Sequence, residues 1–275
     1  MSLDKITHKA LSSTELKDGH SDSATEQTPI LGEQTWKDIE ESVTRSLTQM
    51  FQEVHGRSGL YAEDEHADAL DRLKVNEKIF FTKVLGTVER AHRSYENTAV
   101  LFDVDETIGR APYRADGKRI TILRPSVIPL MDILKNTYGC KLGLFTSRGK
   151  LQEQLEDPAH LATLEPYLDK ELLISTRGSG SSIGSMEFSD ALQVNFGGEN
   201  GIVDDSLISP DPFQRPSLIG DIEKLSHLRK IRAQLPEGAI VIVDDMQYPA
   251  ILNESRGLYG VSLDFSEQNT GTFRL

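Results

Sequence analysis

The sequence predicts an α/β protein built on a doubly wound parallel sheet, with an α-helical extension at its N-terminus. Nearly every position is apolar in four short runs, as in strands covered on both faces. These runs are TAVLF (98–102), KLGLF (141–145), ELLIS (171–175) and AIVIV (239–243). They alternate with helical patterns, and strand–helix alternation of this kind indicates a parallel sheet with helices on both sides.

The acidic composition bounds the classes of partner. The chain has 275 residues, with 43 Asp and Glu against 30 Lys and Arg, a net charge of −13. A body this acidic repels phosphate backbones and anionic lipid, so we expect neither nucleic acid nor a membrane as partner. No apolar run is long enough to cross a membrane, and the first residues lack the apolar core of a secretory signal. We therefore expect a cytoplasmic protein.

The region before the sheet is predicted to contain a tail and two helices. Residues 1–35 are polar and aperiodic, as in a disordered tail. Residues 36–97 form a helical segment, whose first helix is expected to start near Thr35 and whose second is expected over about 65–93. Apolar residues recur at steps of three and four in the first helix: Trp36, Ile39, Val43, Leu47, Phe51 and Val54. We expect these helices to pack against the following domain; self-association through them is the alternative.

Polar side chains follow three of the four strands of the domain expected over residues 98–275. They are Asp103, Asp105 and Thr107, then Thr146 and Arg148, then Asp244 and Asp245. Ligands of doubly wound sheets bind at the carboxyl ends of the strands. Four aspartates gathered there repel one another unless they share a cation, and oxygen ligands without His or Cys suit Mg²⁺.

The spacing of the first two aspartates indicates phosphoryl chemistry. At a strand end the chain turns, so Asp103 and Asp105 can flank one substrate. Asp103 would attack phosphorus and form an aspartyl-phosphate, while Asp105 would protonate the leaving oxygen and later deprotonate water. Mg²⁺ would neutralise the charge that keeps a carboxylate from an anionic phosphate. Thr146 would donate a hydrogen bond to a phosphoryl oxygen, and a lysine should complete the set.

These motifs resemble those of the haloacid dehalogenase (HAD) superfamily. FDVDET, Thr146 and VIVDD occur in the order of its signature motifs, and Asp-x-Asp-x-Thr is similar to the phosphatase version of the first. ILRPSVIPLMDIL followed by LGLFTSR is similar to the Ser/Thr phosphatases that act on the C-terminal domain of RNA polymerase II. The resemblance covers roughly residues 98–275. It implies a HAD-like, Rossmann-like domain without a large cap.

The resemblance also implies roles for individual residues. Asp245 is implied as a direct metal ligand, with Asp244 as a direct or neighbouring partner and the main-chain carbonyl of Asp105 as a further ligand. Together with Asp103 they form the expected metal set. Thr146, Lys224, Thr107 and Arg148 are the substrate-binding candidates, and Arg148 is equally compatible with a surface charge.

Two assignments have competitors within the sequence. The family pattern places lysine directly before Asp-Leu, where this chain has Gly220 before Asp221. Lys224, at the start of the expected helix DIEKLSHLRKI, is the first candidate and Lys230 the second. The pair Asp204–Asp205 in GIVDDS also resembles the last motif, but it follows a shorter apolar run, so AIVIVDD is favoured.

Two other features are left with open roles. The segment 178–220 contains GSGSSIGS and ends in PDPFQRP, and we expect an extended loop or hairpin near the site. Arg124, before Pro125 at an expected helix start, suits packing and substrate binding equally.

The expected function is that of a Mg²⁺-dependent phosphohydrolase. An open site without a lid favours a phosphoprotein substrate. A small metabolite, such as a sugar phosphate or nucleotide, is the alternative. A catalytically idle HAD-fold binding module is a third reading, favoured by the departure at Gly220 and opposed by the presence of both Asp103 and Asp105.

Overall fold

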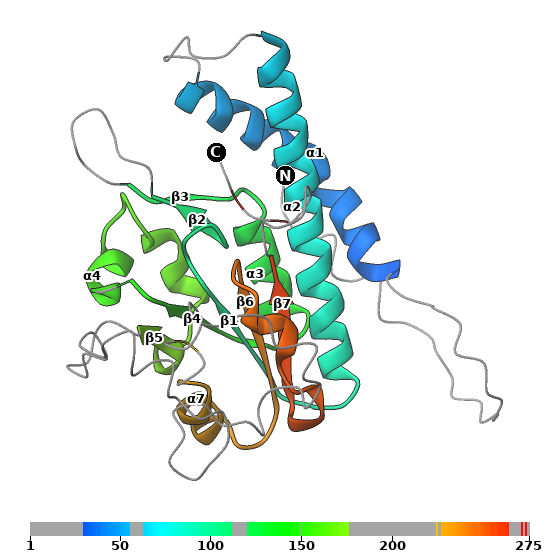
Figure 1. The fold of residues 1–275 in the computed structure, drawn as a ribbon, viewed down its shortest axis with the longest axis vertical. Helices are drawn as coiled ribbons and strands as arrows, with labels where there is room; N and C mark the ends of the chain where they lie inside the picture. The colour runs from blue at the N-terminus through cyan, green and yellow to red at the C-terminus, as the bar shows by residue number, and fades with distance from the viewer. Residues whose placement is uncertain are drawn as a thin grey trace, which may run out of the picture.

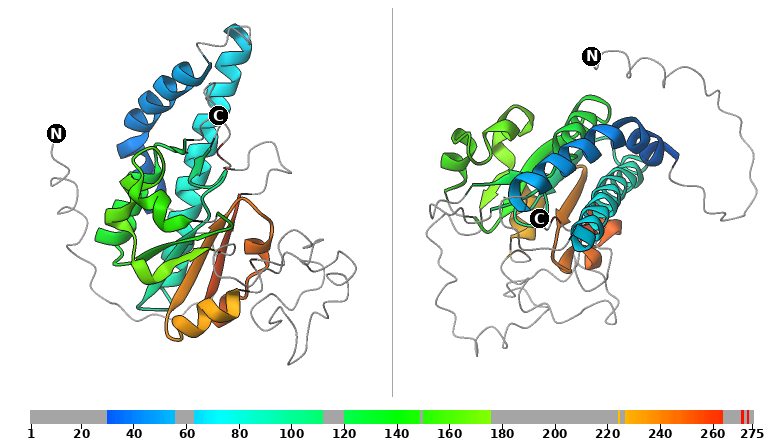
Figure 2. Two further views of the ribbon diagram at one scale, coloured as in Figure 1. Left: turned by 90° about the vertical axis from the view of Figure 1, so that its left-hand side faces the viewer. Right: turned by 90° about the horizontal axis from the view of Figure 1, so that it is seen from above.

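The computed structural model has a pair of long helices followed by an α/β domain (Figure 1). It describes residues 30–55, 63–111, 120–148, 150–175, 224, 227–263, 271 and 273. Helix α1 spans Ile30–His55 and helix α2 spans Glu63–His92. One end of this pair extends beyond the sheet in both Figure 1 and Figure 2. Among the described residues, no helix is long and apolar enough to cross a membrane.

Helix α1 begins five residues before its expected start near Thr35. Residues 30–35, expected to belong to the polar tail, are therefore helical, and the rest of the tail lies outside the described residues. The physical reason is a tertiary contact, since a Cβ on Gly32 would lie 3.7 Å from Cβ of Leu85 in α2. Packing of this first turn on α2 extends the helix beyond the capping signal in the sequence.

The two helices share the hydrophobic core of the domain. The rings of Trp36 in α1 and Phe81 in α2 lie 5.5 Å apart, and both side chains are buried. Val84 and Val88 of α2 belong to the same buried cluster as residues of the sheet. The expected packing of the helical segment on the following domain is therefore confirmed.

The sheet has five parallel strands in the order β5-β4-β1-β6-β7. Their bounds are Thr98–Phe102 (β1), Lys141–Thr146 (β4), Leu173–Ser175 (β5), Ala239–Asp244 (β6) and Leu258–Ser262 (β7). The first four match the apolar runs, and β7 was not predicted. Its sequence is interrupted by Gly260, where a Cβ would lie 1.7 Å from the carbonyl oxygen of Pro249. Close approach of the chain, rather than a side-chain pattern, explains that glycine.

Helices cover both faces of the sheet, as the uniformly apolar strands predict. Val100 and Phe102 of β1 face a core formed with α1, α2, α3 (Val127–Asn136) and α4 (Leu151–Glu156). Leu101 faces a second core, which contains residues of α7 (Leu228–Gln234). The α/β class and the parallel sheet are confirmed, and both are compatible with a Rossmann-like fold.

Short elements complete the described chain. A small antiparallel pair, β2 (Gly109–Arg110) and β3 (Ile122–Leu123), lies between β1 and α3 in the sequence. Four segments are 3-10 helices: Ala162–Tyr167, Lys170–Leu172, Tyr248–Ile251 and Glu254–Arg256. Helix α7 starts at Leu228, later than the helix expected at DIEKLSHLRKI, and continues to Gln234, so Lys224 precedes α7. Residues 221–223, 225 and 226 of that expected helix lie outside the described residues.

Arg124 serves packing, which answers one of the open questions from the sequence. Its Nε lies 2.9 Å from Oε1 of Glu77 in α2, and both side chains are fully buried. Its guanidinium also donates to the carbonyl of Gly271 at 2.6 Å and lies over the ring of Phe80. Glu77 in turn accepts hydrogen bonds from the backbone and hydroxyl of Ser126. This buried ion pair joins α2 to the start of α3.

Replacing Glu77 with glutamine leaves the guanidinium of Arg124 buried without its counter-charge. We expect Glu77→Gln to lower the free energy of unfolding by about 3 kcal/mol, measured by urea denaturation. The matched control is Glu41→Gln, which removes an exposed ion pair with Arg45 in α1 and should cost at most about 0.5 kcal/mol. Equal urea midpoints for the two variants would contradict this role of Glu77.

Candidate functional site

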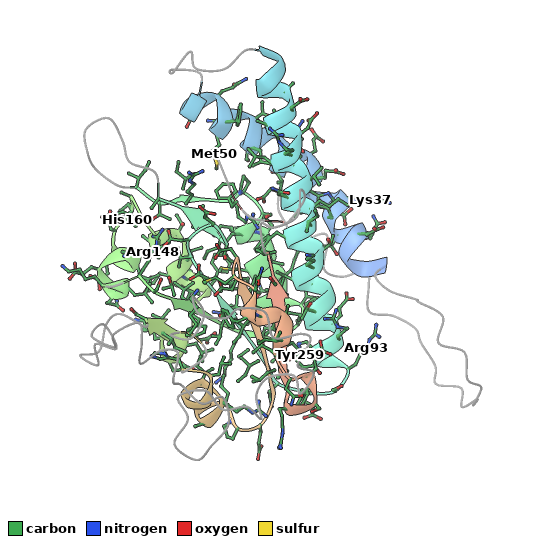
Figure 3. All side chains as sticks on the ribbon, viewed as in Figure 1. Lys37, Met50, Arg93, Arg148, His160 and Tyr259 are labelled. Carbon is green, nitrogen blue, oxygen red and sulfur yellow. The ribbon has the colours of Figure 1, made fainter. Side chains whose placement is uncertain are left out.

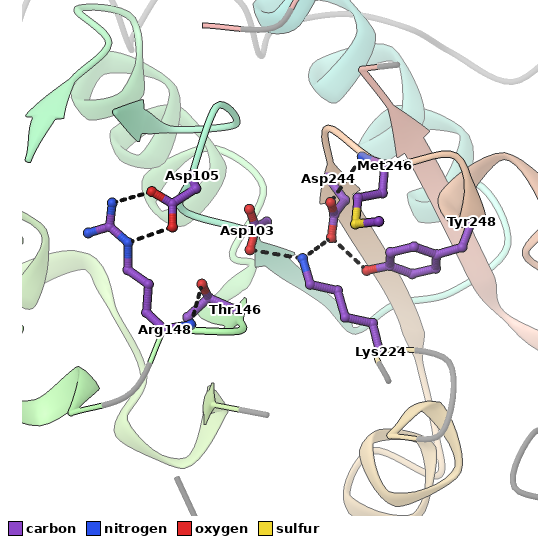
Figure 4. Close-up of polar contacts among 8 residues, drawn as sticks. All are labelled: Asp103, Asp105, Thr146, Arg148, Lys224, Asp244, Met246 and Tyr248. Atoms are coloured by element: carbon purple, nitrogen blue, oxygen red, sulfur yellow. Dashed lines mark hydrogen bonds and ion pairs between the residues drawn. The ribbon is translucent and has the colours of Figure 1, made fainter. Parts of the chain in front are cut away.

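The strand order brings the predicted polar residues to one edge of the sheet. Strand β1 lies between β4 and β6, so the residues that follow these three strands are neighbours. Asp103 follows β1 directly, and its backbone N–H donates to the carbonyl of Val243 in β6 at 2.9 Å. Thr146 ends β4 and Asp244 ends β6. Figure 4 shows the side chains that meet at this edge.

Three of the four predicted aspartates form one cluster. Asp103, Asp244 and Asp245 each offer a carboxylate oxygen, and these three oxygens lie within 4.8 Å of one another. The first two side chains are buried and the third is half-buried. A cluster of oxygen donors without nitrogen or sulfur suits a hard divalent cation. The side chain of Asp105 is not part of the cluster, so only its carbonyl remains as the ligand expected from that residue.

Lys224 lies between two of the clustered aspartates. Its Nζ is 2.9 Å from Oδ1 of Asp103 and 2.5 Å from Oδ2 of Asp244. Burial alone lowers the pKa of the Lys224 ammonium, but these two carboxylates outweigh burial and raise that pKa above its ordinary value. Lys224 is therefore a buried cation at the site. Lys230 belongs to α7, and its side chain lies outside the described residues.

Two of these carboxyl groups, those of Asp103 and Asp245, have a pKa above that of a free aspartate. Burial raises the pKa of Asp103 to about 6, with Lys224 opposing the shift and Asp244 adding to it. Burial, together with the charges of Asp244 and Asp103, raises the pKa of Asp245 to about 8. When fully ionised, three carboxylates and one ammonium carry a net charge of −2. One divalent cation balances that charge, so the donor set fits such an ion.

Both carboxylate oxygens of Asp244 accept hydrogen bonds. Its Oδ2 accepts from Lys224 and, at 2.9 Å, from the hydroxyl of Tyr248, while its Oδ1 accepts from the backbone N–H of Met246 at 3.1 Å. Sequence reasoning missed Tyr248. It lies in a segment that reads as a loop, and only the 3-10 turn Tyr248–Ile251 directs its hydroxyl inward.

Asp105 pairs with Arg148 instead of joining the other aspartates. Its two oxygens accept from Nη2 and Nε of Arg148 at 2.5 Å and 2.9 Å. The side chain of Arg148 is therefore mostly buried and paired with Asp105, and it is not a free surface charge. Its guanidinium also donates to Thr121 and Gln154, and no sequence pattern indicated these two contacts.

The two remaining threonine candidates are buried. Thr146 lies at the end of β4, where its Oγ1 accepts from the backbone N–H of Arg148 at 3.3 Å. Thr107 lies in the loop between β1 and β2, and its side chain is fully buried. The predicted segment 178–220, Gly220 and the pair Asp204–Asp205 lie outside the described residues.

Comparison of the chain with protein-family models, with curated proteins and with solved structures gives no significant match.

Removing one donor from Asp244 tests how firmly this carboxylate is held. Tyr248→Phe keeps the buried ring and deletes only the hydroxyl, so we expect a loss of about 1–2 kcal/mol in the free energy of unfolding. The control is Tyr138→Phe, whose hydroxyl donates to Glu89 at a partly exposed position and should matter less. Thermal unfolding of both variants gives the comparison. A larger loss at Tyr138 would count against a special role for Tyr248.

Proposed function

We propose that the chain is a Mg²⁺-dependent phosphohydrolase that works through an aspartyl-phosphate on Asp103. The observation that carries the proposal is the bridge formed by Lys224 Nζ between Asp103 and Asp244, inside a cluster of three aspartates. A nucleophilic carboxylate needs nearby positive charge to approach an anionic phosphate. The resemblance of the sequence motifs to HAD phosphatases supports the same assignment.

The residues divide the work of the first half-reaction. Asp103, Asp244, Asp245 and the carbonyl of Asp105 would hold the Mg²⁺, which supplies charge neutralisation at the phosphoryl group when bound. A carboxylate oxygen of Asp103 attacks phosphorus as the bond to the leaving oxygen breaks. Lys224 and Thr146 donate hydrogen bonds to the phosphoryl oxygens. Asp105, once protonated and released from Arg148, transfers that proton to the leaving oxygen.

The second half-reaction returns Asp103 to its starting state. Asp105 accepts a proton from water as the water oxygen attacks phosphorus, and the bond between phosphorus and Asp103 breaks. The half-exposed position of Asp105 supports this role, because both the leaving group and the water arrive from solvent. Lys224 Nζ remains beside the carboxylate of Asp103 as it is released.

The position of Lys224 favours an active enzyme over an idle binding module. Gly220 stands where the family pattern has a lysine, and this difference favoured a catalytically idle binding module. Lys224 supplies a cation at hydrogen-bonding distance from the proposed nucleophile, so the feature that favoured an idle domain loses its force. We propose a phosphoprotein as substrate, with sugar phosphates and nucleotides as the alternative to be separated by a substrate screen.

The nucleophile is tested with p-nitrophenyl phosphate in the presence and absence of Mg²⁺. We expect Mg²⁺-dependent hydrolysis by the wild type, and a fall to the uncatalysed background in Asp103→Asn, because an amide does not replace the attacking carboxylate. Asp71→Asn, at an exposed position of α2, is the matched control and should keep full activity. Substantial turnover by a folded Asp103→Asn protein, checked by its melting temperature, would rule out Asp103 as nucleophile.

Metal binding should be linked to proton release. Below its pKa of about 8, the metal-free carboxyl of Asp245 keeps a proton that a metal ligand must lose. Mg²⁺ binding at pH 7 should therefore release about one proton, and affinity should rise between about pH 6 and pH 8. Calorimetry in two buffers with different ionisation enthalpies measures the proton count.

Asp245→Asn is the control for this linkage, because its amide has no proton to release in that range. It should bind Mg²⁺ more weakly and with fewer protons released. Binding heats that are identical in both buffers for the wild type would contradict the linkage.

A further inference from the structure

Asp105 pairs with the guanidinium of Arg148, whereas the other three aspartates of the site cluster together. We propose that Arg148 is a positioning residue, which holds the carboxylate of Asp105 out of the metal cluster and beside it, so that Asp105 serves proton transfer when substrate opens the pair and does not serve as a metal ligand. The inference rests on the proposed function, because it divides four aspartates between two roles. In Figure 4 the carboxylate of Asp105 is directed toward Arg148, while Asp103 and Asp244 face Lys224.

Arg148 is fixed independently of Asp105. Its Nη1 donates to Oγ1 of Thr121 at 2.8 Å and to Oε1 of Gln154 in α4 at 3.0 Å. Its carbonyl accepts from the hydroxyl of Ser175 at 2.5 Å, and its N–H donates to Thr146 at 3.3 Å. The backbone and the guanidinium are therefore both anchored, so the arginine is set in place before it pairs with Asp105.

Thr121 is itself oriented by a further contact. It lies on the chain just before β3, and its backbone N–H donates to the carbonyl of Ala159 at 3.0 Å. Because its hydroxyl oxygen accepts from Arg148, its hydroxyl proton is free to donate to Nδ1 of His160, 3.1 Å away. Figure 3 shows Arg148 and His160 near each other beside α4. The anchor of Arg148 thus extends through Thr121 to His160.

The side chains of Arg148 and Asp105 differ in how much of their surface is exposed to solvent. The side chain of Arg148 is 10% exposed, whereas that of Asp105 is 52% exposed. An exposed aspartate retains several rotamers unless a contact selects one. The bidentate pair with a fixed guanidinium selects the rotamer of Asp105 that points away from Lys224. Arg148 therefore determines where Asp105 lies, and not the reverse.

Positive charge at the cluster attracts the carboxylate of Asp105 in the opposite direction. Asp105 is two residues from Asp103, and the ammonium of Lys224 and a bound divalent cation both attract a free carboxylate. If Asp105 moved onto the cation, the metal would gain a fourth carboxylate ligand and the site would lose its proton-transfer group. Metal affinity and turnover would then change in opposite directions, which a simple loss of folding does not produce.

The test replaces Arg148 with methionine, which keeps an unbranched apolar stem and removes the guanidinium with its donors. We expect Arg148→Met to bind Mg²⁺ about tenfold more tightly by calorimetry, because a fourth carboxylate becomes a ligand. Its kcat with p-nitrophenyl phosphate should fall about a hundredfold while KM changes less, because Asp105 no longer deprotonates the water that attacks the aspartyl-phosphate. Arg148→Lys should recover part of kcat, since an ammonium still attracts Asp105 but without the fork geometry.

A double variant separates this role from the alternatives. Arg148→Met combined with Asp105→Asn should return the Mg²⁺ affinity to that of the wild type, because the fourth carboxylate is gone. Thr121→Val, which removes one anchor without touching the charges, should shift both quantities in the same directions by smaller factors. It also serves as the second probe if Arg148→Met does not fold.

Three results would overturn the proposal. Unchanged or weaker Mg²⁺ binding in both folded single variants, Arg148→Met and Thr121→Val, would mean that Arg148 does not keep Asp105 from the metal. Tighter binding that persists in the double variant would mean that Asp105 is not the added ligand. No Mg²⁺ binding by the wild type would remove the basis of the inference. If the wild type binds Mg²⁺ but hydrolyses no phosphate ester, the proposed function fails, and the affinity shifts still decide where Asp105 lies.

Discussion

Crowding of carboxylates at one edge of a parallel sheet is the constraint on which the site depends. Strands β1 and β6 are neighbours, so Asp103 and Asp244 are brought together by the same hydrogen bonds that form the sheet. Carboxylates this close are stable only if each is paired with a cation, protonated, or bound by a hydrogen-bond donor. Lys224 forms ion pairs with two of them, the raised pKa of Asp245 leaves that carboxyl protonated below about pH 8, and Tyr248 and a backbone N–H donate to Asp244. These contacts together offset the negative charge of the clustered carboxylates.

The helical pair is part of the domain rather than an attachment to it. Helix α2 lies against the sheet and contributes Glu77 to a fully buried ion pair with Arg124. An isolated charge at such a depth is unfavourable, so each partner requires the other. The backbone N–H of Phe273 donates to the carbonyl of Glu106 at 2.7 Å, and Arg124 binds the carbonyl of Gly271. The ion pair thus lies close to the chain segment that contacts the loop after β1, and it connects the helical pair to the surroundings of the site.

Much of the fold and the residue types of the site could be predicted because they follow from local patterns. Uniformly apolar runs gave four strands, and the residues just beyond them include Asp103, Thr146 and Asp244. The lysine was harder, because Lys224 is brought to Asp103 by tertiary structure and not by a motif position. Strand β7, Tyr248 and Thr121 could not be predicted for the same reason. Gly260 is explained by the close approach of Pro249. The hydroxyls of Tyr248 and Thr121 meet Asp244 and Arg148 only in the folded chain.

The pairing of β1 with β6 also bears on how the protein folds. Phe102 and Val243 are paired although they lie about 140 residues apart in the sequence. Contacts of such long range form slowly, because the entropy of closing the intervening chain is lost before the contact is gained. Until β6 arrives, one edge of β1 has no strand partner, and an open edge of an apolar strand can pair with other chains. The arrival of β6 closes this edge and at the same moment delivers Asp244 to Asp103. Assembly of the acidic cluster therefore accompanies the pairing of β1 with β6, and a cation that binds only the assembled cluster would favour the folded chain over its aggregation-prone intermediates.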